Sequence, residues 1–127
     1  MAGRIRIVLV EDNPVFREAL ELLLGLRSEL EVVASVGDGN DAAPAVLEHD
    51  ADVVLMDYRL PGLDGVQATR AVRAAAPDVA VVCLTAAANT REEIDALYTA
   101  GAVACLSKDI ELDAIVGAIQ RAAGARA

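Results

Sequence analysis

Aromatic side chains are scarce in this sequence, which has no Trp, two Tyr and one Phe, so that aromatics make up 2% of its residues. Any hydrophobic core must therefore be built from aliphatic side chains, and apolar residues do make up 55% of the chain. Basic residues are also few, with 11 Lys and Arg against 20 Asp and Glu and a net charge of −9. This charge argues against direct nucleic-acid binding, which needs a basic surface.

Membrane and export signals are missing as well. No apolar run reaches the ~18 residues of a membrane-spanning helix, and the start of the chain lacks the apolar segment of a signal peptide. We therefore expect a cytoplasmic protein with no membrane contact. The two cysteines, Cys83 and Cys105, fall on different predicted strands and are expected to be reduced core residues, since cytosolic disulfides are rare. The single histidine, His49, is expected at the surface, and no spacing suits a zinc site.

The pattern of short apolar runs predicts the fold. At 127 residues we expect one domain with its core over about residues 4–123, and residues 121–127 as a frayed helix end or a linker stub. Four runs have the length and the Val, Ile and Leu content of buried parallel strands: Ile5–Val10, Val53–Met56, Val79–Leu84 and Val103–Leu106. Five strands alternating with five helices predict an α/β flavodoxin-like, doubly wound (βα)5 fold with a five-stranded parallel sheet in the order 2-1-3-4-5.

Start and stop signals place the helices between these runs. Asn13 followed by Pro14 is a helix start, and Thr90 with Glu93 is a capping box whose helix ends at Gly101. The inward face of the first helix is predicted to comprise Phe16, Ala19, Leu20 and Leu23. The other helices are expected at about 40–48, from Asp64 or Gly65 to before Pro77, and from about Glu111 with Leu112, Ile115, Val116 and Ile119 on its inward face.

Five polar residues lie at the ends of the four apolar runs: Glu11, Asp12, Asp57, Thr85 and Lys108. In an open doubly wound sheet, ligands bind outside the carboxyl ends of the strands. Singly, Thr85 could be a strand-end hydroxyl and Lys108 a solvated charge, but that interpretation requires five coincidences at one sheet edge. We expect one site with three carboxylates, one hydroxyl and one ammonium.

The charges of such a site indicate its chemistry. Two carboxylates about 4 Å apart repel by roughly 4 kcal/mol at an effective dielectric constant near 20, and one lysine cannot neutralise three of them. Mg²⁺ binds oxygen ligands of this kind together with phosphate and water, and it neutralises charge in phosphoryl transfer. One carboxylate can itself act as the nucleophile and form an aspartyl phosphate. Thr85 and Lys108 could then bind phosphoryl oxygens.

Several motifs resemble the receiver domain of two-component response regulators over about residues 4–123. They are VLVEDNP (8–14), DVVLMDYRLPGLDG (52–65), Leu84-Thr85-Ala86, Gly101-Ala102 and LSKD (106–109), in the order and spacing of that family. The segment RLPGLDGVQATR (59–70) and the Lys108-Asp109 pair are most similar to the NarL/FixJ-like subfamily, whose receivers precede a LuxR-type helix-turn-helix domain.

The resemblance implies a role for each acidic residue. Asp57 would be the phosphoacceptor, and its phosphoryl donor would be a phosphohistidine of a partner histidine kinase. Mg²⁺ would be bound directly by Asp12 and Asp57, through water by Glu11, and by the backbone carbonyl of Arg59.

The resemblance also implies a two-state switch. Thr85 would be the switch hydroxyl, and Ala86 and Lys108 would bind the phosphoryl group. The domain would control transcription through a DNA-binding domain outside this chain, with formation of a homodimer on phosphorylation as one outcome. It would catalyse its own phosphorylation and dephosphorylation but would act on no outside substrate.

Two positions depart from the family pattern. Cys105 stands where an aromatic residue usually lies three residues before the lysine, and Tyr98 stands where Leu usually lies three residues before Gly101. Because a cysteine cannot swing like an aromatic ring, we expect the relay from Thr85 to depend on backbone movement after that residue. The bulky Tyr98, on the expected output face, would assist it.

Three other functions remain open at this point. The chain could be a stand-alone receiver that signals by protein binding, or an atypical receiver that is never phosphorylated. An aspartyl-phosphate phosphatase would need a second aspartate two residues after Asp57, where this sequence has Arg59.

Overall fold

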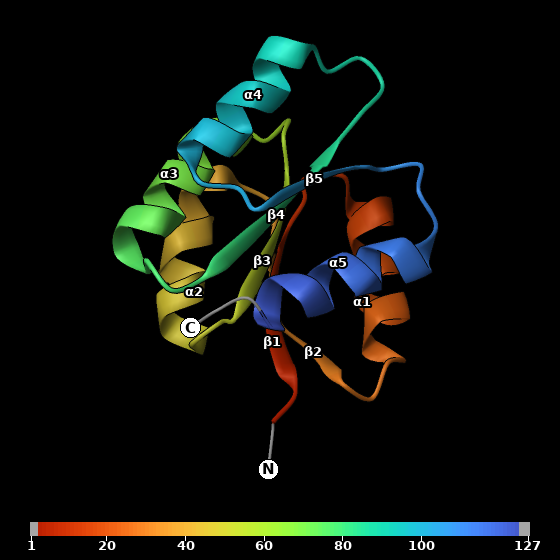
Figure 1. The fold of residues 1–127 in the computed structure, drawn as a ribbon. Coiled ribbons are helices and arrows are strands. Elements are labelled where there is room, and N and C mark those ends of the chain that lie inside the picture. The colour runs from red at the N-terminus through yellow and green to blue at the C-terminus, as the bar shows by residue number, and fades with distance from the viewer. Residues whose placement is uncertain (1–2, 125–127) are drawn as a thin grey trace.

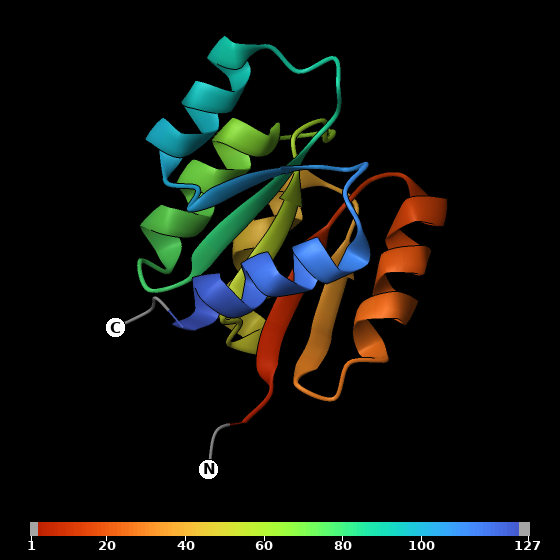
Figure 2. The same cartoon turned by 45° about the vertical axis from the view of Figure 1, so that its right-hand side comes forward.

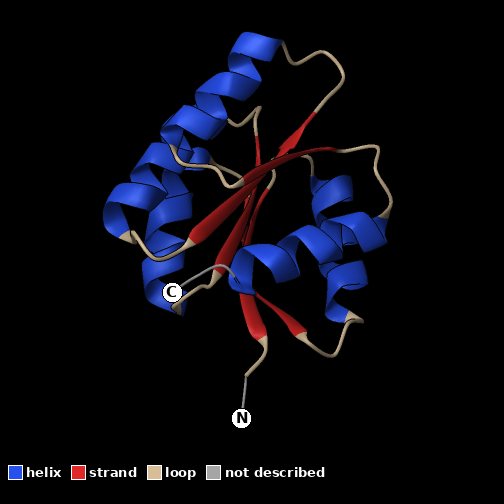
Figure 3. Cartoon of the chain, viewed as in Figure 1, coloured by secondary structure: helices blue, strands red, loops and turns tan. Residues whose placement is uncertain are grey.

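The protein, described over residues 3–124 by a computed structural model, contains one five-stranded parallel sheet covered by helices on both faces (Figures 1 and 3). The strand order is β2-β1-β3-β4-β5, which confirms the predicted flavodoxin-like order. Within the described residues, no helix has both the length and the apolar content of a membrane crossing. The elements in chain order are β1 (Ile5–Val10), α1 (Pro14–Gly25), β2 (Leu30–Val36), the 3₁₀ turn η1 (Gly39–Asp41), α2 (Ala42–His49), β3 (Val53–Asp57), α3 (Gly65–Ala75), β4 (Ala80–Thr85), α4 (Arg91–Ala100), β5 (Ala104–Ser107) and α5 (Leu112–Gly124).

The apolar runs of β1, β3 and β4 exist because this part of the sheet is buried on both faces. The run at β5, predicted as a buried strand, lies instead at an edge of the sheet and is only partly buried. Successive side chains of a strand point to opposite faces, so in β3 Val53 and Leu55 pack against α1 and α5, whereas Val54 and Met56 pack against α2, α3 and α4. Figure 2 shows these two helical layers on either side of the sheet. Strand β2 lies at an edge and is only partly buried. Its run is interrupted by Glu31 and Ser35, which explains why the sequence did not mark its bounds.

The inward face of α1 differs from the prediction. Leu20 is buried as expected, but the buried residue beside it is Leu24, with Phe16 half-buried one turn before Leu20. Ala19 is exposed and Leu23 is 41% exposed, so their assignment to the core was wrong. The helix buries a stripe with i, i+4, i+8 spacing, and apolar residues occur on its other faces as well, so the sequence pattern was ambiguous.

The predicted helix ends are confirmed where a cap marked them. The Asn13 side chain accepts from the backbone N–H groups of two residues in α1, and Thr90 forms its capping box with Glu93. Helix α3 starts at Gly65, with Asp64 as the cap. Helix α5 continues to Gly124, so residues 121–124 are helical and not a linker. Residues 125–127 of the predicted tail lie outside the described residues.

A close backbone contact joins the start of α3 to the end of β3. The Gly65 N–H donates to the Tyr58 carbonyl at 2.8 Å. A Cβ atom at Gly65 would lie 2.7 Å from Tyr58 Cα and 2.8 Å from the Asp57 carbonyl oxygen, which is closer than packing permits. Glycine at this position therefore lets α3 pack directly behind Asp57.

We predict that Gly65→Ala lowers the free energy of unfolding by about 2 kcal/mol, because backbone atoms must move to admit the methyl group. Gly117→Ala, in α5, is the matched control. A Cβ atom there would meet only the flexible end of Arg121, so the better helix propensity of Ala should raise stability by roughly 0.5–1 kcal/mol. Urea unfolding of both variants measures this difference, and equal effects would contradict the close contact at Gly65.

Candidate functional site

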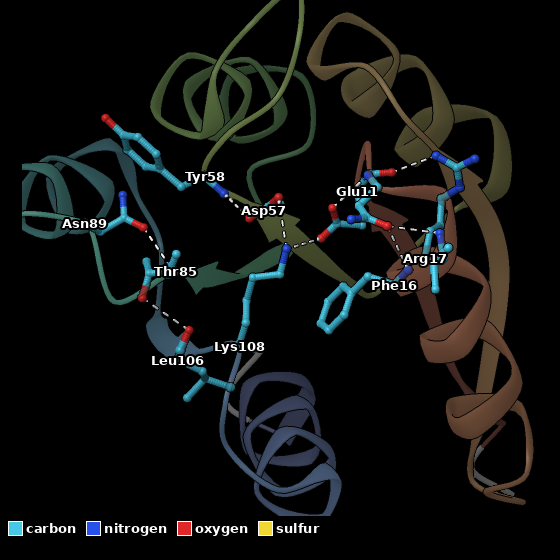
Figure 4. Close-up of polar contacts among 12 residues, drawn as sticks. Glu11, Phe16, Arg17, Asp57, Tyr58, Thr85, Asn89, Leu106 and Lys108 are labelled. Carbon is cyan, nitrogen blue, oxygen red and sulfur yellow. Dashed lines mark hydrogen bonds and ion pairs between the residues drawn. The ribbon is translucent and has the colours of Figure 1, made fainter.

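The carboxyl ends of four strands meet at one edge of the sheet and carry the five predicted residues. Glu11 and Asp12 follow β1, Asp57 ends β3, Thr85 ends β4 and Lys108 follows β5. Figure 4 shows the Glu11, Asp57 and Lys108 side chains turned toward one another. A cavity of about 240 Å³ at this edge is lined by Glu11, Asp12, Asn13, Asp57, Arg59, Ala86, Asn89 and Lys108.

Three carboxylates converge in this cavity. Glu11, Asp12 and Asp57 each offer one carboxylate oxygen, and these oxygens lie within 4.8 Å of one another. Glu11 and Asp57 are buried and Asp12 is exposed, so the cluster is open to solvent on one side. Oxygen donors with remaining room for water and phosphate are the environment that Mg²⁺ prefers. The donor set therefore fits a magnesium ion.

Lys108 forms ion pairs with two of these three carboxylates. Its Nζ donates to Glu11 Oε1 at 2.8 Å and lies 3.4 Å from Asp57 Oδ2. Burial acts against the charged form, but the bond to Glu11 and the charge of Asp57 outweigh it and raise the pKa of Lys108 above its usual value. The ammonium also lies 4.3 Å from the centre of the Phe16 ring, a cation–π distance. The sequence pattern predicts Phe16 only as a core residue and gives no sign of this contact.

Asp57 is held in an environment that disfavours its charge. Its Oδ1 accepts from the Tyr58 N–H at 2.9 Å. Burial, reinforced by the neighbouring charge of Glu11, raises the pKa of Asp57 from 3.8 to about 6, although Lys108 acts in the opposite direction. The carboxylate is thus ionised at neutral pH but remains in a site where added positive charge is favourable.

The two acids after β1 differ in their surroundings. Both Glu11 carboxylate oxygens have partners, Oε1 with Lys108 and Oε2 with the Asn13 N–H at 3.0 Å. The Glu11 backbone is also held, because Arg17 Nη1 donates to its carbonyl at 2.7 Å. Asp12 instead faces solvent at the mouth of the cavity. This difference makes Asp12 the more available ligand of the pair.

Thr85 and Ala86 occupy the β4 end of the site in different ways. The Thr85 side chain is buried, and its Oγ1 donates to the Leu106 carbonyl of β5 at 3.3 Å, away from Asp57 (Figure 4). The Thr85 carbonyl accepts from the Lys108 N–H at 2.9 Å, so the two strand ends are joined. Ala86 lines the cavity, and its N–H donates to Asn89 Oδ1 at 2.8 Å.

Asn89 and Glu93 extend this site to α4. Asn89 Nδ2 donates to Glu93 Oε1 at 3.1 Å, and the same oxygen accepts from the Thr90 N–H at 2.8 Å. The sequence analysis missed Asn89 as a site residue and identified Glu93 only as part of a helix cap. The sequence feature that could have identified Asn89 is its position, as an amide side chain in the short segment between Thr85 and the helix cap at Thr90.

The two departures from the family pattern lie in contact. Tyr98 Oη accepts from the Cys105 N–H at 3.1 Å, so the tyrosine of α4 reaches over to β5, the last strand of the sheet. The Tyr98 side chain is otherwise 48% exposed. Cys105 lies opposite Cys83 in the β4–β5 register, and both thiols are free; Cys83 is a buried core residue as predicted, whereas Cys105 is only partly buried.

Comparisons with known proteins agree on one family. The response regulator receiver domain profile matches residues 7–120. The transcriptional regulatory protein DegU of Brevibacillus brevis is 36% identical over 118 residues, which cover 93% of this chain and 50% of DegU. The chain thus spans about half the length of this relative.

Two solved structures extend the comparison. The signal receiver domain of NarL from Mycobacterium tuberculosis has a TM-score of 0.91 and 33% identity, covering 98% of this chain and 100% of that domain. The receiver domain of the sensor histidine kinase PA1611 from Pseudomonas aeruginosa has a TM-score of 0.80 and 33% identity, with 98% and 100% covered. That structure contains a magnesium ion coordinated in its active site cleft.

We predict that Asp57→Asn stabilises the metal-free protein by about 1–3 kcal/mol at about pH 7.5. The pKa of Asp57 is about 6 in the folded chain against 3.8 for an ordinary aspartate. Because the folded state holds this proton to higher pH, stability falls as the pH rises through about 4 to 6. The gain from Asn should therefore vanish below about pH 4. Urea unfolding in EDTA across this pH range measures the difference in stability between Asp57→Asn and the wild type. If Asp57→Asn were less stable than the wild type at every pH, the ionised Asp57 carboxylate would not be destabilising.

Proposed function

This chain belongs to the response regulator receiver domain family, and we propose that it is a phosphorylation-activated switch in which Asp57 accepts a phosphoryl group from a histidine kinase. The observation that carries this proposal is the placement of Lys108 between Asp57 and Glu11 in the three-carboxylate cavity. That arrangement provides a nucleophile, an ammonium for a phosphoryl oxygen and a set of magnesium ligands in one place.

The proposed transfer uses the ionised carboxylate of Asp57. One of its oxygens attacks the phosphorus of the kinase phosphohistidine, the P–N bond breaks, and the imidazole leaves with the electron pair. Lys108 then exchanges its weaker contact with Asp57, at 3.4 Å, for a phosphoryl oxygen. Dephosphorylation is a separate hydrolysis, in which water attacks the phosphorus and Asp57 leaves as a carboxylate with inorganic phosphate as product. The domain acts on no substrate except its own acyl phosphate.

Mg²⁺ is the proposed cofactor. Asp12, Asp57 and the Arg59 carbonyl would bind it directly, and Glu11, which is engaged by Lys108, would bind it through water. When bound, it supplies positive charge next to the transferring phosphoryl group. The magnesium ion in the PA1611 receiver supports this assignment for a domain with the same fold.

Transcription control through a LuxR-type helix-turn-helix domain is the proposed output. Its support is that DegU is a transcriptional regulator about twice as long as the segment that matches this chain.

The proposed output faces are α4, β5 and α5, or α1 and α5 in a homodimer. Exposed apolar side chains on and just after α1, Val15, Leu22 and Leu26, favour the second. The free thiols of Cys83 and Cys105 suit a cytoplasmic location.

The proposed switch begins at Thr85. When its hydroxyl leaves the Leu106 carbonyl for a phosphoryl oxygen, β5 loses one of its contacts with β4. Tyr98 Oη, bonded to the Cys105 N–H, would pass that change to α4. This contact provides a route that needs no aromatic side chain at Cys105.

Phosphorylation of Asp57 is tested directly by incubation with acetyl phosphate and Mg²⁺ followed by intact-mass measurement. We expect one added phosphoryl group in the wild type, none in Asp57→Asn, and none when EDTA removes the metal. Asp50→Asn is the matched control, because Asp50 caps α2 with a left-handed conformation that Asn also adopts. Labelling that persists in Asp57→Asn would refute the proposed function.

We predict that Asp12→Ala weakens Mg²⁺ binding more than Glu11→Gln does, by an additional factor of about ten, which corresponds to about 1.4 kcal/mol. The reason is that Asp12 would be a direct ligand, whereas Glu11 acts through water. Calorimetric titration with MgCl₂ measures both variants. Equal losses, or a greater loss in Glu11→Gln, would show that the two roles are reversed.

A further inference from the structure

One backbone donor of the cavity is already engaged by a side chain. The Ala86 N–H, which follows β4, donates to Asn89 Oδ1 at 2.8 Å, and both residues line the cavity that contains Asp57 and Lys108. Figure 4 shows the Asn89 side chain turned back toward the segment that follows Thr85. The Asn89 amide oxygen thus occupies a backbone donor at the β4 end of the cavity that contains Asp57.

We infer that Asn89 is a positioning residue that competes with the phosphoryl group for the Ala86 amide and, when displaced, transmits phosphorylation to the first turn of α4. This inference rests on the proposed phosphorylation of Asp57. A phosphoryl oxygen is ionised, and hydrogen bonds to ionised acceptors are about twice as strong as those to a neutral amide oxygen. We therefore expect the phosphoryl group to displace the Asn89 oxygen from the Ala86 N–H. Its binding is nevertheless weakened, because the hydrogen bond between Ala86 and Asn89 must first break.

The other contacts of Asn89 connect it to the cap of α4. Its Nδ2 donates to Glu93 Oε1 at 3.1 Å, the same oxygen that accepts the Thr90 N–H in the cap of α4. Glu93 N–H in turn donates to Thr90 Oγ1 at 3.1 Å. An Asn89 side chain that loses Ala86 is free to rotate, so the carboxylate that caps α4 loses a fixed partner. Linkage is reciprocal, so if phosphoryl binding loosens the α4 cap, a change that loosens the cap must in turn favour phosphoryl binding.

A simpler role for Asn89 is to close the turn after β4, because its own N–H donates to the Ala86 carbonyl at 3.0 Å. That role predicts lower stability in Asn89 variants but the same affinity for a phosphoryl group. Lower stability in Asn89 variants therefore does not distinguish the two roles. A change in the affinity for a phosphoryl group is expected only if Asn89 competes for the Ala86 amide.

The test uses beryllofluoride, an analogue of the phosphoryl group, with Mg²⁺ and backbone amide NMR on the whole chain. Removing the competitor in Asn89→Ala should tighten beryllofluoride binding by about three- to tenfold, the range expected for one hydrogen bond. Asn89→Asp keeps an acceptor on the Ala86 amide and adds negative charge, so it should weaken binding. Thr90→Ala is the matched control, since it loosens the α4 cap by removing a bond to Glu93 but leaves the bond between Asn89 and Ala86. Linkage through the cap alone should raise affinity in this control by less than it rises in Asn89→Ala, because the Ala86 amide stays occupied.

Hydrogen exchange at residues 91–94 provides the second measurement. Beryllofluoride should increase exchange there in the wild type, whereas in Asn89→Ala exchange should already be raised and no longer respond. Unchanged affinity in Asn89→Ala, or equal tightening in Thr90→Ala, would overturn the inference while Asp57 is still phosphorylated by acetyl phosphate. If the wild type neither binds beryllofluoride nor is labelled at Asp57, the proposed function fails and this inference fails with it.

Discussion

The structure depends on the pairing of Lys108 with Glu11, one of the three clustered carboxylates. Glu11 is fully buried, and an unpaired buried carboxylate would be strongly destabilising. Lys108, from the far end of the chain, supplies its partner at 2.8 Å and lies over the Phe16 ring. Lys108 is the cation that pairs with these carboxylates in the described structure, and it contacts only Glu11 and Asp57 of the three. Burial, with the neighbouring charge of Glu11, raises the pKa of Asp57, and the three carboxylate oxygens together form a donor set that fits a magnesium ion.

The near-absence of aromatic residues gives the few that are present distinct positions. The Phe16 ring lies under Lys108, the Tyr58 ring lies 5.8 Å from the Arg59 guanidinium, and Tyr98 bonds to the β5 backbone at Cys105. The aliphatic core formed by the two faces of the sheet leaves these rings at its edges. Each of them therefore contacts a backbone or charged group of the site or of the adjoining edge strand.

Two connections lead from the carboxyl edge of the sheet toward α4. One runs through Thr85, Leu106 and the Tyr98 contact at Cys105. The other runs through Ala86 and Asn89 to Glu93. Both are hydrogen bonds between neighbouring elements, which change partners more readily than packed side chains, so α4 is the element best placed to respond to the site.

The sequence by itself determined the order of the strands, most helix ends and the meeting of five polar residues at one edge of the sheet, because these depend on local rules. A strand buried on both faces must be apolar throughout, a helix start needs a cap, and the ends of parallel strands share one edge. The face of α1 was not determined, because its exposed leucines are as apolar as its buried ones. The orientation of Thr85 and the contacts made by Tyr98 and Asn89 were also decided only by the tertiary structure. Each of these is a choice among several partners of similar strength, and only the distances between the folded elements select one.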